Sequence, residues 1–374
     1  MKKNLFVRIL SLISLMTFIF ILGCQTESVE NSANNCVVKP VVVTDTVKHD
    51  TDDPAIWINP DDPSKSLIIG TDKDSDGALY VFDLNGKVIE EKTVRNLKRP
   101  NNVDVEYGLI LNGKKVDIAV ATERETNKIR VYSLPDMKEI DNGGIDVFVG
   151  EKLRAPMGIS LYKRGTDGAV YAIVSRKEGP LDGYLFQYLL IDDGNGFVTG
   201  KLVRKFGSYS GKKEIESIAV DDKLGYVYYS DEQVGIRKYY ADPDAKDANV
   251  QLGFISTTDY LEDNEGISIY EVDDNTGYIL VSDQSANRFR IYTREGTPAD
   301  PEEELAAEPH NHKLVKIVNV MTNKSDGSEI VNVQLNNKFP GGLFVAMSDN
   351  RTFQYYSWAD IAGKDLLHAK GSVK

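Results

Sequence analysis

The sequence predicts an all-β fold: a six-bladed β-propeller with four-stranded antiparallel blades. Three observations predict it. A strand of alternating character that contains a tyrosine recurs six times, at intervals of 51 to 63 residues. An apolar strand that ends on Thr or Ser precedes each of these strands, and the repeat contains no long helical pattern. A period of about 50 residues built from short strands is typical of propeller blades.

Each blade is marked by its tyrosine and by the start of an earlier strand. The six tyrosines are Tyr80, Tyr132, Tyr188, Tyr239, Tyr292 and Tyr355. The earlier strands begin about 18 residues before the apolar strands, at Asp52-Asp53, Asn102 to Asp104, Met157, Glu216, Glu265 and Ser325 to Glu329. Antiparallel pairing places the start of one strand beside the end of the next. We therefore expect a ring of polar residues at one end of the propeller.

The last blade lacks an outer strand of its own, because the chain after Trp358 shows no strand pattern. The β-branched run that follows Cys36 can supply this strand and close the ring. The longest interval between tyrosines contains a Pro/Glu-rich insertion. His310 and His312 lie in this insertion, and we interpret them as part of an exposed loop rather than as metal ligands.

The N-terminus has the anatomy of an export signal. A basic start and an apolar run lead to Gly23-Cys24, which resembles a lipobox, so we expect a lipoprotein-type signal peptide over 1–23 and lipidation of Cys24. A flexible tether is expected over 24–35 and the propeller over 36–374. The protein would then be exported and either secreted or lipid-anchored to the cell envelope, at the outer membrane in a Gram-negative cell. An uncleaved membrane helix and a plain secretory signal are the alternatives.

The charge of the chain limits its partners. A net charge of −13 argues against nucleic acid, which needs a clustered basic surface. The ring divides into two sides. Blades one to three contribute the basic residues Lys73, Arg124, Arg176 and Lys177. Blades four to six contribute the acidic residues Glu216, Asp231, Glu232, Asp263, Glu265, Asp283 and Asp326. Lys and Arg bind phosphate oxygens. Dense carboxylates without Cys or His suit calcium, so we expect several calcium ions that bridge to a polyphosphorylated ligand.

Two motifs early in the chain connect this ring to a known family. Asp52 to Trp57 reads DDPAIW, and Asn101 to Asp104 reads NNVD. Together they resemble the opening signature of the β-propeller phytases. The likeness continues in RKEG at Arg176, DNEG at Asp263 and SDQ at Ser282. It covers nearly the whole chain after the tether.

The resemblance implies a six-bladed propeller that hydrolyses phytate or other inositol polyphosphates as their calcium complexes, by direct attack of calcium-bound water. It implies phosphate binding and a part in catalysis for Lys73, Arg124 and Lys177, and Arg176 is added to the phosphate-binding residues from the charge pattern. It implies calcium and water ligands at Asp53, Asp104, Glu216, Glu232, Asp263, Glu265, Gln284 and Asp326, of which Glu216 and Glu232 are also assigned to catalysis. A monomer that contacts the membrane only through its lipid is expected.

The chain departs from the family pattern at three positions near these residues. Met157 stands where the family often has Tyr, Asp74 where it has Lys, and Ser217 where it has Gly. Two other functions therefore stay open: a different calcium-dependent propeller hydrolase such as a lactonase, and a surface propeller that binds a ligand without catalysis. A neutral lactone would not need the basic set, and phosphate release would exclude both alternatives.

Overall fold

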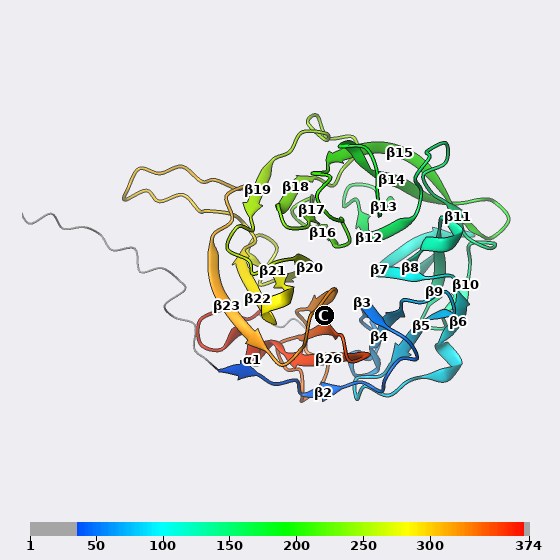
Figure 1. Ribbon diagram of the computed structural model, residues 1–374, viewed down its shortest axis with the longest axis horizontal. Helices are drawn as coiled ribbons and strands as arrows, with labels where there is room; N and C mark the ends of the chain where they lie inside the picture. The colour runs from blue at the N-terminus through cyan, green and yellow to red at the C-terminus, as the bar shows by residue number, and fades with distance from the viewer. Residues whose placement is uncertain (1–35, 370–374) are drawn as a thin grey trace, which may run out of the picture.

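The computed structural model describes residues 36–369, in which six sheets surround a central axis (Figure 1). The predicted signal peptide and the predicted tether, including Cys24, lie outside these residues. The six-bladed propeller is confirmed. In each blade the strands follow one another in sequence order from the axis outwards. The exceptions are the two N-terminal strands that close the ring, which are described below.

The first three blades follow one another along the chain. Blade one contains β3 (Thr51–Trp57), β4 (Leu67–Asp72), β5 (Gly77–Phe82) and β6 (Val94–Leu97). Blade two contains β7 (Pro100–Leu111), β8 (Lys114–Glu123), β9 (Lys128–Leu134) and β10 (Lys138–Glu139), with β11 (Ile145–Asp146) also paired to β9. Blade three contains β12 (Pro156–Lys163), β13 (Val170–Arg176), β14 (Asp182–Asp192) and β15 (Val198–Ser208).

The other three blades complete the ring. Blade four contains β16 (Ile218–Asp221), β17 (Tyr226–Asp231), β18 (Gly235–Tyr240) and β19 (Gly253–Ser256). Blade five contains β20 (Asn264–Glu271), β21 (Gly277–Asp283), β22 (Arg288–Thr293) and β23 (Leu314–Val320). Blade six contains β24 (Ser328–Val331), β25 (Leu343–Ser348) and β26 (Thr352–Ser357).

Helix is scarce in the described part of the chain. The α-helix α1 (Trp358–Ala362) follows β26, and four 3-10 turns join other elements: η2 (Pro63–Lys65), η3 (Glu90–Lys92), η4 (Arg124–Thr126) and η5 (Gln284–Ala286). Within residues 36–369, none of the helices has the length and apolar character needed to cross a membrane.

The N-terminal run closes the ring, as predicted, but it serves two blades. β2 (Val42–Val43) pairs antiparallel with β26 and is the outer strand of blade six. β1 (Val37–Val38) pairs parallel with β23 and becomes a fifth strand of blade five. In Figure 1 the two blue strands lie beside the orange and red strands of the C-terminal blades. The first described residues therefore hold the last two blades together.

Apolar clusters fill the spaces between neighbouring blades. Among the described residues there are six main clusters, and each joins two adjacent sheets; one contains Ile118 and Val120 of β8 together with Ile159 and Leu161 of β12. Every sheet is thus covered on both faces. This explains why the second strand of each blade is a continuous apolar run instead of an alternating one.

In blades two to five, the Thr or Ser at the end of the second strand joins its blade to the next one. Thr122 donates to the Met157 carbonyl in the next blade at 2.6 Å, and Ser175 donates to the Ile215 carbonyl at 2.5 Å. Ser230 and Ser282 make the corresponding bonds further round the ring. A hydroxyl satisfies a buried carbonyl that no strand pairs. The repeated residue type therefore fixes how the inner strands sit around the axis.

The Pro/Glu-rich insertion forms the long loop at the left of Figure 1, and one prediction about it is wrong. His312 is buried: its Nδ1 lies 2.7 Å from the Thr293 carbonyl, and its Nε2 lies 3.2 Å from the ammonium of buried Lys238. His312 therefore anchors the base of the insertion to blade four. Lys238 also donates to the Pro309 carbonyl at 2.7 Å.

Candidate active site

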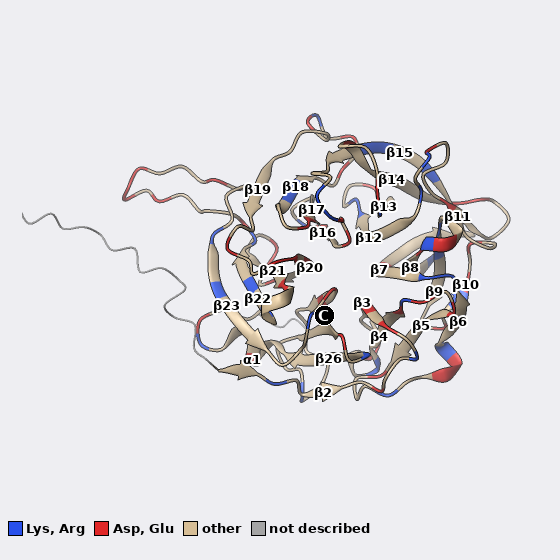
Figure 2. Ribbon diagram, in the orientation of Figure 1, with Lys and Arg blue, Asp and Glu red and all other residues tan. Residues whose placement is uncertain are grey.

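Polar side chains from all six blades meet at one end of the central channel. Ion pairs, hydrogen bonds and close carboxylate contacts connect them. We call this set the mouth cluster: Asp52, Lys73, Asn101, Arg124, Lys177, Lys213, Glu214, Glu216, Glu232, Asp263, Glu265, Gln284 and Asp326. Figure 2 shows acidic segments at the inner end of β3 and beside β20, next to the axis.

Lys73 joins the first and last blades at the mouth. It follows β4, and its ammonium forms an ion pair with Asp52 and lies 3.8 Å from the Asp326 carboxylate. Burial opposes the charged form of Lys73, but Asp52 and Glu216 outweigh burial and raise its pKa. Gln284 donates to the other oxygen of Asp326. Lys73 is therefore a fixed positive charge among carboxylates.

Glu216 is held across the channel by blade two. The Asn101 side-chain nitrogen donates to Glu216 Oε1 at 2.8 Å and to Asp52 Oδ2 at 2.9 Å. Arg124 Nη2 lies 3.6 Å from the same Glu216 oxygen. Burial opposes ionisation of Glu216, but Lys73 and the bond from Asn101 more than compensate and lower its pKa. Glu216 is thus an ionised carboxylate at neutral pH.

A glycine permits this close approach. A Cβ atom at Gly158 would lie 1.8 Å from the backbone oxygen of Glu216, far inside van der Waals contact. The inner strand of blade three can therefore lie against the start of blade four only with glycine at this position. Gly158 places the Glu216 backbone at the mouth.

Two groups of carboxylates have oxygens close enough to share a metal ion. The first is Glu214, Glu216 and Glu232, and the second is Glu232, Asp263 and Glu265; within each group the ligand oxygens lie within 4.8 Å of one another. Burial and the charge of Glu216 raise the pKa of Glu232 to about 7. Burial and Glu232 raise the pKa of Glu265 well above its usual range.

The donor atoms of these groups fit calcium. All are carboxylate oxygens, which hard cations prefer, and neither group contains His or Cys. Glu232 Oε1 and Glu265 Oε2 are buried and have no hydrogen-bond partner in the structure. A buried carboxylate oxygen without a partner is unfavourable unless a cation satisfies it. The two groups are therefore a suitable calcium centre.

Lysines neutralise part of this centre. Lys177 forms an ion pair with Glu214, a partner that the sequence reasoning did not identify. Lys213 lies 2.5 Å from Asp263 Oδ2 and 3.0 Å from Glu232 Oε2. The acidic side of the mouth thus contains a lysine of its own.

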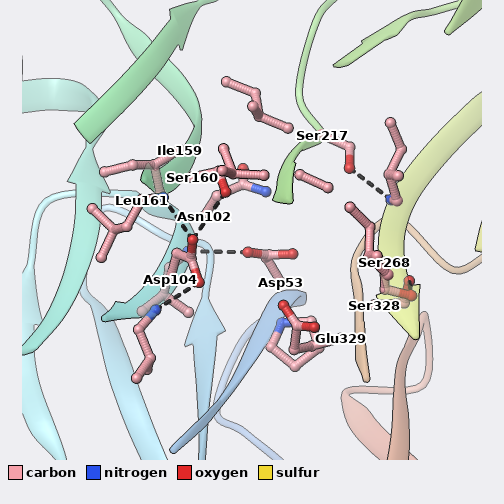
Figure 3. Close-up of a pocket in the computed structure, with 18 of the residues that line it drawn as sticks. Asp53, Asn102, Asp104, Ile159, Ser160, Leu161, Ser217, Ser268, Ser328 and Glu329 are labelled. Carbon is pink, nitrogen blue, oxygen red and sulfur yellow. Dashed lines mark hydrogen bonds between the residues drawn. The ribbon is translucent and has the colours of Figure 1, made fainter. Parts of the chain in front are cut away.

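Two predicted calcium ligands lie deeper than the mouth. Asp53 and Asp104 line a cavity of about 150 Å³ in the channel, together with Glu329, which the sequence reasoning did not single out (Figure 3). Asp53 accepts from the Val103 amide at 3.0 Å, and Asp104 accepts from Leu161 at 2.7 Å. Burial raises the pKa of Asp104 to about 6 and that of Glu329 to about 8. We call these three residues the channel cluster.

Arg176 does not reach the mouth cluster. Its side chain is 1% exposed, and its guanidinium lies over the rings of Phe148 and Phe186 at 4.8 and 5.2 Å. It also pairs with Glu151 at 3.4 Å. The structure therefore contradicts the placement of Arg176 among the substrate-binding residues. Arg176 is the last residue of β13 and Lys177 follows it, and the two side chains point in opposite directions. Only Lys177 belongs to the mouth cluster.

Two acidic residues of the predicted ring are paired within their own blades. Asp231 forms an ion pair with Arg237 at 2.8 Å, and Asp283 pairs with Arg288 at 2.7 Å and Arg290 at 3.1 Å. Both aspartates are completely buried. They stabilise the hairpins and are not free to bind a metal.

The remaining predicted residues do come together. The mouth cluster contains the predicted basic residues Lys73, Arg124 and Lys177. It also contains the predicted ligands Glu216, Glu232, Asp263, Glu265, Gln284 and Asp326. The sequence reasoning missed Asn101, Lys213 and Glu214. Asn101 belongs to the NNVD motif, which was a usable signal. Lys213 and Glu214 lie in the connection before β16, outside the repeat, so no period could identify them.

Comparisons with known proteins agree with this geometry. A family model described as phytase matches residues 4–362. The chain is also similar to a curated 3-phytase of Bacillus subtilis (strain 168), with 34% identity over 327 residues. This match covers 83% of the present chain and 80% of the relative.

Proposed function

Because this chain belongs to the phytase family, we propose that it hydrolyses phosphomonoester bonds of phytate, myo-inositol hexakisphosphate, and of other inositol polyphosphates, with several calcium ions as cofactors. One observation supports this best: at a single end of the channel, basic side chains of three blades meet carboxylates with partnerless oxygens. The first set suits phosphate and the second suits a cation.

The ion pairs of the mouth explain how a chain of net charge −13 can bind a polyanion. Lys73 and Lys177 are each paired with a carboxylate, and Arg124 lies close to one. When a divalent cation binds the carboxylates, it replaces the basic groups as their partner. The basic groups can then bind phosphate oxygens, and neither the carboxylates nor the basic groups are left as unpaired buried charges. Calcium and substrate therefore assist each other's binding.

Calcium held by Glu214, Glu216, Glu232, Asp263 and Glu265 would supply positive charge beside the phosphate and lower the pKa of water at the site. The side chains of the mouth cluster bind the phosphate and position the reacting groups. Arg124 presents two nitrogens to the phosphate, Lys73 and Lys177 present point charges, and Asn101 holds the Glu216 carboxylate in position.

The reaction is a direct displacement. Water forms the new bond to phosphorus and gives up a proton, the bond from phosphorus to the inositol oxygen breaks, and that oxygen takes up one proton to become a hydroxyl, so that one water is consumed for each phosphate released. No Ser, Cys or His belongs to the mouth cluster, and most of its carboxylates are engaged by Lys73, Lys177, Lys213 or Asn101, so attack by water without a phosphoenzyme fits its members best. Positioning and charge neutralisation supply most of the rate.

The N-terminal motif supports a second, separate proposal. Because Gly23-Cys24 resembles a lipobox, the protein is exported and attached to the cell envelope by a lipid on Cys24. Metabolic labelling with a fatty acid tests it: label is expected on the native chain and not on a Cys24→Ser variant. Label on both chains would contradict the proposal.

Release of inorganic phosphate from phytate, with calcium present and then chelated, tests the proposed function. Release that needs calcium is expected. A folded protein that releases no phosphate at any calcium concentration would instead favour a propeller that binds without catalysis. Hydrolysis of a neutral lactone without phosphate release would favour a lactonase.

A further inference from the structure

Lys213 occupies an unusual position for a lysine, inside a group of metal-ligand oxygens. It lies in the connection before β16, and its ammonium contacts Asp263 Oδ2 at 2.5 Å and Glu232 Oε2 at 3.0 Å. The Glu232 side chain is 2% exposed and that of Asp263 is 12% exposed, whereas that of Lys213 is 39% exposed. The lysine reaches its partners from the solvent side.

The ammonium satisfies the group only in part. Glu232, Asp263 and Glu265 place oxygens within 4.8 Å of one another, and Lys213 contacts the first two residues. Glu232 Oε1 and Glu265 Oε2 stay buried without a partner. A single positive charge therefore balances three carboxylates incompletely. A divalent cation, with six to eight oxygen ligands, would satisfy them better.

We propose that Lys213 is the resident counter-ion of the Glu232–Asp263–Glu265 group and that it competes with a divalent cation for these oxygens. The lysine stabilises the group when no metal is bound, and its ammonium must leave Glu232 and Asp263 before a cation can take both oxygens. Lys213 thereby sets the calcium concentration at which the site fills. This inference rests on the proposed function, which assigns calcium to the mouth.

Lys177 differs from Lys213 in the extent of its contact. Lys177 pairs with Glu214 alone, and Glu214 is the most peripheral member of the other group, with 26% of its side chain exposed. Lys213 bridges two members of one group, both nearly buried. Loss of Lys213 should therefore change metal affinity far more than loss of Lys177.

The test compares Lys213→Met with Lys212→Met. Lys212 is the preceding residue of the same connection, is exposed, and donates to the Gln233 carbonyl at 2.9 Å, so its replacement removes the same charge without touching the group. Calcium binding is measured by titration calorimetry on the full chain without substrate, and melting curves are recorded with calcium and with chelator.

Lys213→Met is expected to bind calcium at one site about fivefold or more tighter than Lys212→Met, within the range usual for two coupled binding events. It should melt at a lower temperature in chelator and gain more from calcium than the control. Equal affinities in the two variants, or weaker binding by Lys213→Met, would overturn the proposal.

A second variant covers the case in which Lys213→Met does not fold. Lys213→Gln keeps a long polar side chain that can donate hydrogen bonds, and tighter calcium binding is expected here too. If the native chain binds calcium and both variants match it, only the role of Lys213 is wrong. If the native chain shows no calcium binding at all, the calcium part of the proposed function fails as well.

Discussion

The Asn101 side chain of blade two donates a 2.8 Å hydrogen bond to Glu216 Oε1 of blade four, across the mouth of the channel. The same nitrogen also holds Asp52 at 2.9 Å. A neutral amide thus orients two carboxylates from different blades. This bond is one of the causes that keep the pKa of Glu216 below its usual range.

Replacement of Asn101 by Ala should shift the acidic side of the pH–rate profile. Without the amide, the pKa of Glu216 rises, so a smaller fraction is ionised at low pH and activity is lost at a higher pH than in the native protein. A hydrogen bond to a charged group is worth about 1.5–3 kcal/mol, so kcat/KM should fall about tenfold or more. Asn195→Ala, at an exposed loop of blade three, is the control. An unchanged pH profile would contradict this role.

Glu216 and Arg124 should affect different kinetic constants. Glu216→Ala removes a carboxylate shared by the predicted metal site and the reacting centre, so kcat should fall by about 100-fold or more. Arg124→Ala should mainly raise KM for phytate, because the guanidinium binds phosphate oxygens before reaction. Steady-state kinetics separate the two effects. Arg154→Ala serves as control, because it removes an arginine that pairs with Asp146 and donates to the Val147 carbonyl and is not part of the mouth cluster. Normal turnover by Glu216→Ala would refute its assignment.

Lys73 should contribute to stability as well as to binding. Replacement of Lys73 by Met removes the cation that pairs with the buried Asp52 carboxylate. Because a buried charge is then left without its partner, the unfolding free energy should fall by about 3–5 kcal/mol. The double variant Lys73→Met/Asp52→Asn should recover most of that stability and still bind phytate weakly. Denaturant unfolding and KM measure the two effects. Recovery of normal KM in the double variant would show that Lys73 acts only through Asp52.

The chelated protein should lose stability as the pH rises. Burial raises the pKa of Glu329 from 4.5 to about 8, so between these values the native state binds more protons than the unfolded chain. The unfolding free energy then falls with increasing pH, by at most about 1.4 kcal/mol per pH unit for one group. Melting in chelator from pH 5 to 9 tests this. Glu329→Gln should flatten the profile, whereas Glu303→Gln in the exposed insertion should not.

Removal of residues 36–46 should lower the melting temperature sharply. The segment supplies β1 and β2, and Thr44 accepts a hydrogen bond from the Phe353 amide at 2.9 Å. Val42 is buried, which alone contributes about 1.5–3 kcal/mol. A chain that begins at Val47 is compared with one that begins at Cys36. Equal melting temperatures would mean that blades five and six do not need these strands.

The blade count and the end of the propeller that carries the polar ring follow from the sequence, because both depend on local and repeated signals. Tyr80, Tyr132 and their counterparts mark strands through a period, and Thr122 and Ser175 mark the ends of buried strands. Antiparallel pairing then fixes which ends meet. The closing role of the first strands was also predictable, because blade six visibly lacked a strand.

The direction of individual side chains was decided by the tertiary structure. Successive residues of a strand face opposite sides, so a bulge between Thr51 and Pro54 determines that Asp52 joins the mouth while Asp53 lines the channel. The same alternation buries Arg176 and leaves Lys177 at the mouth. Lys213 comes from a connection outside the repeat, and only the packing of blade four against blade five brings its ammonium to Asp263. The sequence alone thus determines the fold and the types of residue at the site, whereas bulges and loop packing determine which of them meet.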